Sequence, residues 1–102
     1  MDLANPLFDP EIVRLQYADV GQQQPSDPEL LLVPVDWISS WQEHLQHWKL
    51  KQLRDAERRL PPVDICVYGE VWAVRDGNHR VVAALERGEE EISAYVTVMT
   101  RM

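Results

Sequence analysis

Short apolar runs separated by turn residues recur along the chain after residue 29. Val63–Tyr68 and Val71–Arg75 are rich in β-branched and aromatic residues, which predicts two strands. Gly69-Glu70 between them has the length and the glycine of a two-residue hairpin turn. Ile92–Met99 alternates along its length, and Leu30–Val35 is a short apolar run, so each predicts a further strand. Pro34 in the second run indicates either a strand at a sheet edge or the end of the strand.

Other segments have the spacing of helices. Asp9-Pro10 is a helix-start signal, because Asp caps free amides and Pro suits the first turn, and it predicts a helix over residues 10–17. A second and longest helix is predicted from Trp41 to Arg59. Its apolar stripe, which we expect in the core, comprises Trp41, Leu45, Trp48, Leu53, Ala56 and Leu60. A third helix is predicted from His79 to Arg87 and ends at Gly88.

The predicted order is helix, strand, long helix, hairpin, helix and strand. This mixture indicates an α+β fold in which helices pack on a small mixed sheet, and 102 residues suit one such domain. Gly21–Pro28 is rich in Gln and Pro and is predicted to be a loop. We therefore divide the chain into residues 1–29, an N-terminal helix and loop, and residues 30–102, the folded domain.

Composition narrows the functional classes. Ten basic and seventeen acidic residues give a net charge of -7, which argues against binding to nucleic acid or to an anionic membrane. Cys66 is the single cysteine and lies in an apolar segment, so we expect a buried thiol and no intrachain disulfide. The first residues lack the features of a signal peptide, and no apolar run is long enough to span a membrane, so a cytoplasmic protein is expected.

The segment Asp76-Gly77-Asn78-His79-Arg80 carries the clearest candidate chemistry, because a strand is predicted to enter it and a helix to leave it. The first amides of a helix lack intrahelical acceptors and sit at the positive end of the dipole, so they attract anions. Gly77 permits close backbone approach, Arg80 can contact phosphate oxygens, and His79 can donate to an oxygen or exchange a proton. The alternative interpretation is an ordinary turn in which Asn78 caps the helix.

A family resemblance adds to this interpretation. Ile92–Val96 resembles the I-P-A-x-V strand of ParB N-terminal domains, and Val33–Ile38 is similar to their opening strand. The candidate turn also resembles the G-G-C-H-R motif of sulfiredoxin. The resemblance spans residues 30–99 and implies a ParB/sulfiredoxin-like fold. Its most specific part is the ParB motif G-E-R-R-x-R-A-x-x-x-x-G, which this chain matches in spacing at Gly77, Arg80, Ala83 and Gly88.

The resemblance also implies a ligand. In that superfamily this strand, turn and helix hold nucleotide phosphates: ParB binds CTP, sulfiredoxin uses ATP, and some relatives are free-serine kinases. It therefore implies a nucleotide ligand (ATP, ADP or CTP) with Mg²⁺, held by Gly77, Asn78, His79 and Arg80, while Asp76 orients the turn or the metal. Asn78 stands where sulfiredoxin has its nucleophilic cysteine, so reduction of a sulfinic acid is not expected.

Alternative functions remain open at this point. One is phosphoryl transfer to a small hydroxyl compound, with Glu43 or Asp76 as general base. Another is a regulatory interaction module, since an acidic surface with spare aromatics suits a basic protein partner. Trp37 and Trp72 are candidates for lining a pocket or a homodimer interface. His44 and His47 share a helix face but lack a third metal ligand, so they indicate a solvated polar face.

Overall fold

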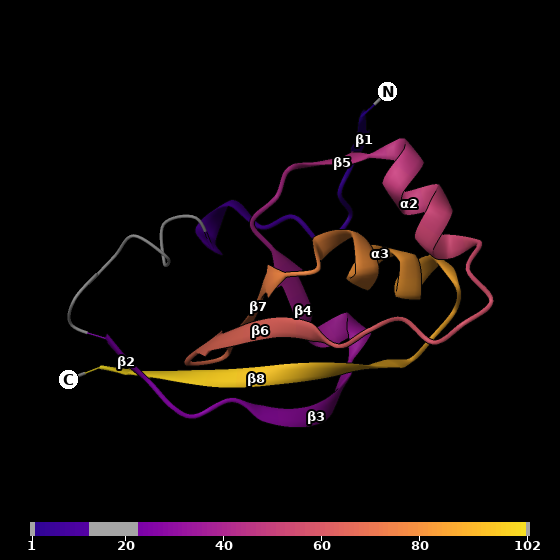
Figure 1. Ribbon diagram of the computed structural model, residues 1–102. Helices are drawn as coiled ribbons and strands as arrows, with labels where there is room; N and C mark the ends of the chain where they lie inside the picture. Colours follow the sequence, from indigo (N-terminus) through magenta and orange to yellow (C-terminus); the bar gives the residue numbers. More distant parts are fainter. Residues whose placement is uncertain (1, 13–22, 102) are drawn as a thin grey trace.

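The computed structural model describes residues 2–12 and 23–101, and most of its strands form one mixed sheet. The strand order is β2-β8-β6-β7-β4, with β3 paired to β8 beside β2 (Figure 1). The long strand β8 is antiparallel to β2 and β3 and parallel to β6, and β7 is antiparallel to β6 and parallel to β4. The strands of this sheet are β2 (Gln23–Pro25), β3 (Glu29–Pro34), β4 (Ile38–Ser40), β6 (Val63–Tyr68), β7 (Val71–Asp76) and β8 (Glu91–Arg101).

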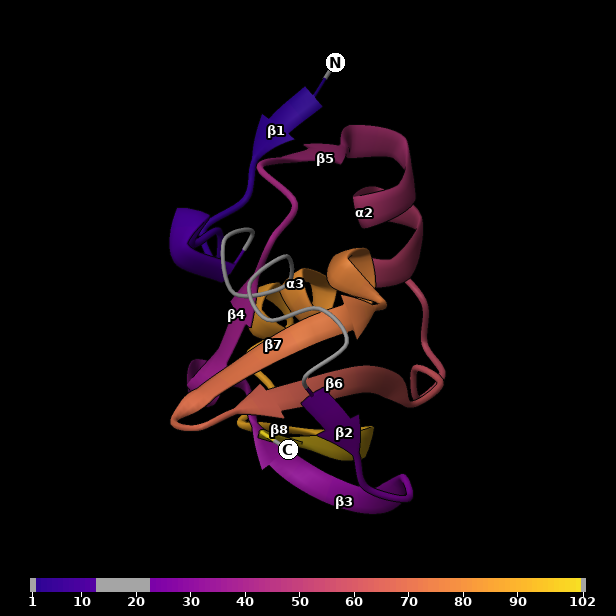
Figure 2. The same ribbon diagram turned by 90° about the vertical axis from the view of Figure 1, so that its left-hand side faces the viewer.

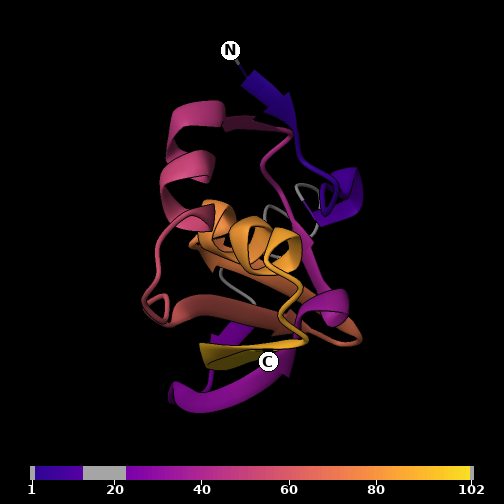
Figure 3. The ribbon, with the colours of Figure 1, turned by 90° about the vertical axis from the view of Figure 1, so that its right-hand side faces the viewer.

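The α-helices α2 (His47–Arg54) and α3 (Asn78–Glu86) lie on the same face of the sheet (Figure 3). A short 3₁₀ helix, η1 (Val35–Trp37), joins β3 to β4. A separate two-stranded sheet pairs β1 (Asp2–Ala4) with β5 (His44–Gln46); it lies beside α2, on the far side of α3 from the main sheet (Figure 2). This combination of a mixed sheet and packed helices confirms the predicted α+β class.

Helix α3 is the centre of the molecule because it is buried on two sides. Its Val81 and Ala84 pack with sheet residues such as Ile65 in the main core. Its Val82 and Ala83 pack in a second core against Leu45 and Leu50, which come from β5 and α2. The four consecutive apolar residues Val81-Val82-Ala83-Ala84 thus supply two side chains to each core. The start of α3 is consequently held between two layers.

The predicted strands and the last helix match the structure to within two residues at each end. Gly69 turns the β6–β7 hairpin with a φ of 62°. Helix α3 ends in a Schellman motif: Gly88 has a φ of 76°, its amide donates to the Leu85 carbonyl, and the Glu89 amide donates to the Ala84 carbonyl. The buried Cys66 is also as predicted.

The long helix predicted from Trp41 to Arg59 is wrong. Residues 44–46 instead form β5, which pairs with β1 from the start of the chain, and the helix spans only His47–Arg54. Trp41 and Trp48, expected in the core, are exposed. Long-range pairing with the N-terminal segment therefore overrides the helical spacing, and Leu45 is buried from a strand rather than from a helix.

The N-terminal segment takes part in the fold. Residues 10–12 begin a helix, and the Asp9 carboxylate accepts a hydrogen bond from the Glu11 amide at 3.0 Å, so the predicted helix start is confirmed. The rest of the helix predicted over residues 10–17 lies outside the described residues. The loop predicted over Gly21–Pro28 is wrong at Gln23–Pro25, which form β2 because they find backbone partners on β8. None of the described helices is long and apolar enough to cross a membrane.

Candidate functional site

The turn between β7 and α3 depends on Gly77. Its φ is 105°, which L-residues rarely adopt, and its position is also crowded. A Cβ atom placed there would lie 2.6 Å from Cγ1 of Val63, well inside van der Waals contact. Both conditions require glycine, and together they bring the first turn of α3 close to the start of β6.

The first turn of α3 has free hydrogen-bond donors. Within residues 2–12 and 23–101, the amides of Asn78, His79 and Arg80 have no hydrogen-bond acceptor, and no side chain caps the helix. The Val81 amide is the first to bond within the helix, to the Gly77 carbonyl at 3.0 Å. The start of α3 therefore presents unpaired N–H groups and the positive end of a helix dipole.

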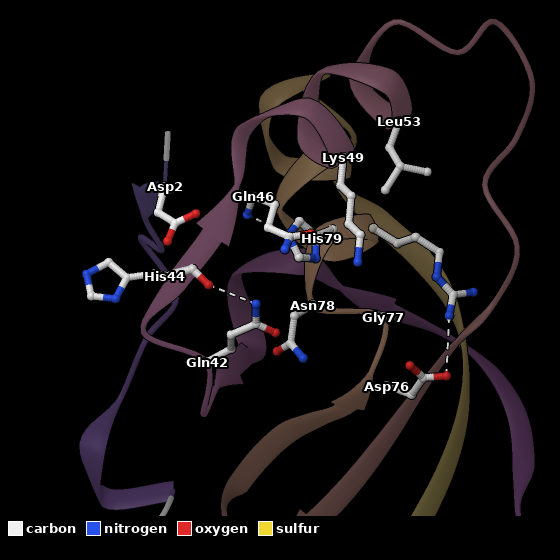
Figure 4. Close-up of a pocket in the computed structure, with 11 residues that line it drawn as sticks. Asp2, Gln42, His44, Gln46, Lys49, Leu53, Asp76, Gly77, Asn78 and His79 are labelled. Atoms are coloured by element: carbon white, nitrogen blue, oxygen red, sulfur yellow. Dashed lines mark hydrogen bonds and ion pairs between the residues drawn. The ribbon is translucent and has the colours of Figure 1, made fainter.

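A cavity of about 570 Å³ lies beside this turn (Figure 4). One wall is the predicted segment Asp76-Gly77-Asn78-His79-Arg80, all five residues of which line the cavity. The opposite wall comes from elements that precede α3 by some thirty residues in the sequence, and Asp2 of β1 contributes at the rim. The lining residues of that wall are Gln42, His44, Gln46, Lys49 and Leu53.

A buried polar network holds the floor of the site. The Ser40 hydroxyl donates to Oδ1 of Asn78 and accepts from Nδ2 of Asn5 at 2.9 Å and from the Gln42 amide at 3.1 Å. Nδ2 of Asn5 also donates to the Gln42 carbonyl at 2.9 Å. Asn78 is therefore not a helix cap; its side chain fixes the start of α3 to β4 and to the N-terminal segment.

His79 is a neutral hydrogen-bond acceptor in this structure. Its Nε2 accepts from the Gln46 amide at 2.9 Å, so its proton is assigned to Nδ1. Burial, followed by repulsion from the Lys49 ammonium, lowers the pKa of His79 below its ordinary value of 6.5. The ring thus ties α3 to the end of β5 and leaves Nδ1–H as its remaining donor.

Arg80 is partly engaged by the protein itself. Its Nη1 donates to the Pro62 carbonyl at 2.7 Å and to the Pro61 carbonyl at 3.3 Å, and its Nη2 lies 3.7 Å from the Asp76 carboxylate. The guanidinium therefore braces the segment before β6 while it lines the cavity. Lys49 is exposed and lines the cavity beside His79 (Figure 4), and its ammonium lies 5.5 Å from the centroid of the Trp48 ring.

Of the other candidates only His44 lines this cavity, and it does so from β5, so the prediction that it shares a helix face with His47 of α2 is wrong. Glu43 is exposed and does not line it, although its backbone carbonyl accepts from the Asn5 amide at 3.0 Å. No group of three or more metal-ligating side chains occurs among the described residues, and His47 does not line the cavity. Trp37 and Trp72 form an edge-to-face pair 5.5 Å apart and line a separate shallow hollow.

Sequence reasoning missed the wall opposite α3. Lys49 was part of a helix predicted to be much longer, and nothing in its local pattern marked it as a cavity residue. No local pattern indicated the hydrogen bond between Asn5 and Ser40, because it joins residues 35 positions apart. Only tertiary packing brings Lys49 of α2, Ser40 of β4 and Asn5, which follows β1, to the predicted turn.

Comparison with known proteins identifies the fold. No protein-family model matches the sequence, and no curated protein matches it. The crystal structure of sulfiredoxin from Arabidopsis thaliana is similar, with a TM-score of 0.57 and 21% identity over 68% of this chain and 84% of that one. The C-terminally truncated chromosome-partitioning protein ParB from Caulobacter crescentus, complexed with CTP-γ-S, gives a TM-score of 0.57 and 15% identity. That match covers 67% of this chain and 43% of the ParB chain, less than half of its length.

Proposed function

We propose that this chain, which has the ParB/sulfiredoxin-like fold that its sequence predicted, binds a nucleotide or another phosphate-bearing ligand at the start of α3. The observation that carries the proposal is the set of free amides at Asn78, His79 and Arg80 beside a cavity of about 570 Å³. That volume is within the usual range for small-molecule sites. The similar ParB structure contains CTP-γ-S, which supports a nucleotide in particular.

Each part of the wall has a role in this proposal. The free amides and the helix dipole hold phosphate oxygens, and Lys49 supplies a positive charge from the opposite wall. The positive charge of Arg80 also attracts phosphate, although Nη1 of Arg80 already donates to the Pro61 and Pro62 carbonyls. The Nδ1–H of His79 is available to donate to a ligand oxygen.

Asp76 is the only one of the five predicted site residues, Asp76 to Arg80, that carries a negative charge, and this charge repels phosphate. Its exposed carboxylate lies at the cavity and has Arg80 Nη2 at 3.7 Å. Mg²⁺ prefers oxygen ligands, keeps several waters and is commonly shared between one carboxylate and substrate phosphates, so Asp76 fits a Mg²⁺ that arrives with a nucleotide. Nucleotide affinity should accordingly rise with added Mg²⁺, and Asp76→Asn should reduce that gain.

The test is calorimetric titration with CTP, ATP and ADP, each with and without Mg²⁺. Lys49→Ala should weaken binding by about 10- to 100-fold, since a charge-assisted contact contributes about 1.5–3 kcal/mol. Lys51→Ala is the matched control, because Lys51 is on the same helix, pairs with Asp55 at 2.9 Å and does not line the cavity. Absence of binding at millimolar nucleotide, or equal weakening by both variants, would refute the proposal.

A second candidate function, transfer of a phosphoryl group to a small hydroxyl compound, is favoured by one observation. Of the two carboxylates considered as general base, Asp76 lines the cavity whereas Glu43 does not. Phosphoryl transfer relies mainly on positioning and charge stabilisation, and a carboxylate can accept the proton of the attacking hydroxyl. Asp76→Asn should then abolish nucleotide turnover in the presence of the acceptor, and turnover that survives it would exclude this role.

A further inference from the structure

The surface of β3 is unusually apolar for an exposed strand. Leu30 and Leu32 are 56% and 58% exposed, and Tyr95, which is the register partner of Leu30 on β8, is 44% exposed. Because side chains alternate along a strand, these residues face away from Val33 and Ala94, which are buried in the main core. Figure 1 shows β3 at the rim of the sheet, on the side opposite the helices.

The outer backbone edge of β3 has no strand paired to it within residues 2–12 and 23–101. The Val35 amide donates to the Glu90 carbonyl at 2.9 Å, which continues the antiparallel register of β3 with β8 and defines Val35 and Glu90 as a hydrogen-bonded pair. Alternate residues of an antiparallel ladder point their N–H and C=O groups to opposite edges. Leu30 and Leu32 therefore direct theirs outward, where no strand among the described residues pairs with them.

The ends of the strand limit what can pair there. Pro34 occupies an outward-facing position, where its missing N–H costs no bond to β8, and Pro28 precedes the strand. Between these prolines the edge offers two features together, unpaired backbone groups and exposed leucines, and none of the usual lysines or bulges that block an edge. The edge is therefore open to one short strand.

We propose that a second copy of this chain supplies that strand, by antiparallel pairing of β3 with the partner's β3 about a two-fold axis at Leu31. In this register Leu30 faces the partner's Leu32, and each exchanges N–H···O=C bonds with the other through the outward groups. The surface is self-complementary, as an isologous dimer requires. Glu29 falls opposite the partner's Val33, so the two Glu29 carboxylates stay apart.

The chemistry of the edge favours this occupant over a basic partner. The segment from Leu30 to Val33 carries no charge, and its exposed leucines join those of the copy and both Tyr95 rings on one face. Each chain has a net charge of -7, so two copies repel at long range. Added salt should screen that repulsion and strengthen the dimer, whereas it would weaken association with a cationic partner.

Sedimentation velocity of the full chain over a micromolar-to-millimolar concentration series tests the proposal. The wild type should reach the mass of two chains, with a dissociation constant that falls as NaCl is added. Leu32→Lys should raise this constant by at least about tenfold, because it places an ammonium in the paired strand beside the partner's Leu30. Leu85→Lys, on the outer side of α3 and 39% exposed, is the matched control and should leave it unchanged.

Leu32→Pro isolates the backbone contribution. It removes an outward N–H that makes no bond to β8, so circular dichroism should show a folded chain and sedimentation a weakened dimer. A wild-type chain that stays monomeric throughout the series overturns the proposal. A dimer that Leu32→Lys and Leu85→Lys leave equally intact overturns it too, because its interface would then lie elsewhere.

Discussion

Replacing Ser40 by Ala tests the network that fixes the start of α3. Ser40 is 1% exposed, and its hydroxyl is the only hydrogen-bond partner of Oδ1 of Asn78 among the described residues. Without the hydroxyl, the buried Oδ1 of Asn78 has no donor and the Gln42 amide loses its acceptor. Asn5 Nδ2 keeps its bond to the Gln42 carbonyl. The hydroxyl thus connects three segments that are far apart in the sequence.

The expected cost follows from these lost bonds. An unsatisfied buried polar group costs about 1–3 kcal/mol, and the remaining hydrogen bonds about 1 kcal/mol together, so Ser40→Ala should destabilise the chain by about 2–4 kcal/mol. A small domain has a free energy of unfolding of about 5–15 kcal/mol, so the loss is a large fraction. With a urea dependence of about 1–2 kcal/mol/M, a 3 kcal/mol loss lowers the midpoint by about 1.5–3 M.

Urea unfolding followed by tryptophan fluorescence and by far-ultraviolet circular dichroism measures this loss. Ser39→Ala is the control, because Ser39 is the neighbour of Ser40 on β4 and makes no side-chain hydrogen bond within the described residues; it should change stability by less than about 0.5 kcal/mol. A double-mutant cycle with Asn5→Ala should show coupling, since the two side chains bond directly at 2.9 Å. Equal midpoints for Ser39→Ala and Ser40→Ala would refute the reasoning.

Two further predictions concern the turn and the histidine. Gly77→Ala should lower the free energy of unfolding by more than about 2 kcal/mol, because a φ of 105° and a distance of 2.6 Å to Cγ1 of Val63 both oppose a Cβ. Gly69→Ala is the control: its φ is 62° and its Cβ would meet open space, so it should cost only about 1 kcal/mol of backbone strain. Equal urea midpoints would contradict this. The pKa of His79 lies below 6.5 in the folded chain, so the unfolded chain binds more protons and the free energy of unfolding should fall as pH drops from about 7 to about 5. His79→Gln should flatten that fall, and an NMR titration giving His79 a pKa at or above 6.5 would contradict the assignment.

Local signals in the sequence are enough to predict part of the fold. The hairpin of β6 and β7, helix α3 and strand β8 were predicted to within two residues at each end, because turn glycines and the period of the apolar residues are local properties. Gly69 and Gly88 have the positive φ values that their positions imply. The turn from Asp76 to Arg80 was recognised for the same reason: strand, glycine and helix follow one another directly.

The surroundings of that turn depend on contacts between distant segments. The helical spacing from Trp41 onward was misleading, because pairing of β5 with β1 buries Leu45 and leaves Trp41 and Trp48 in solvent. The same packing brings Lys49 to the cavity and joins Ser40 to Asn78. These contacts link residues some thirty to forty positions apart, and local periodicity carries no information about which distant segment meets which. Whether amides at a helix start are free or already bonded is likewise settled only by the neighbours that the fold provides.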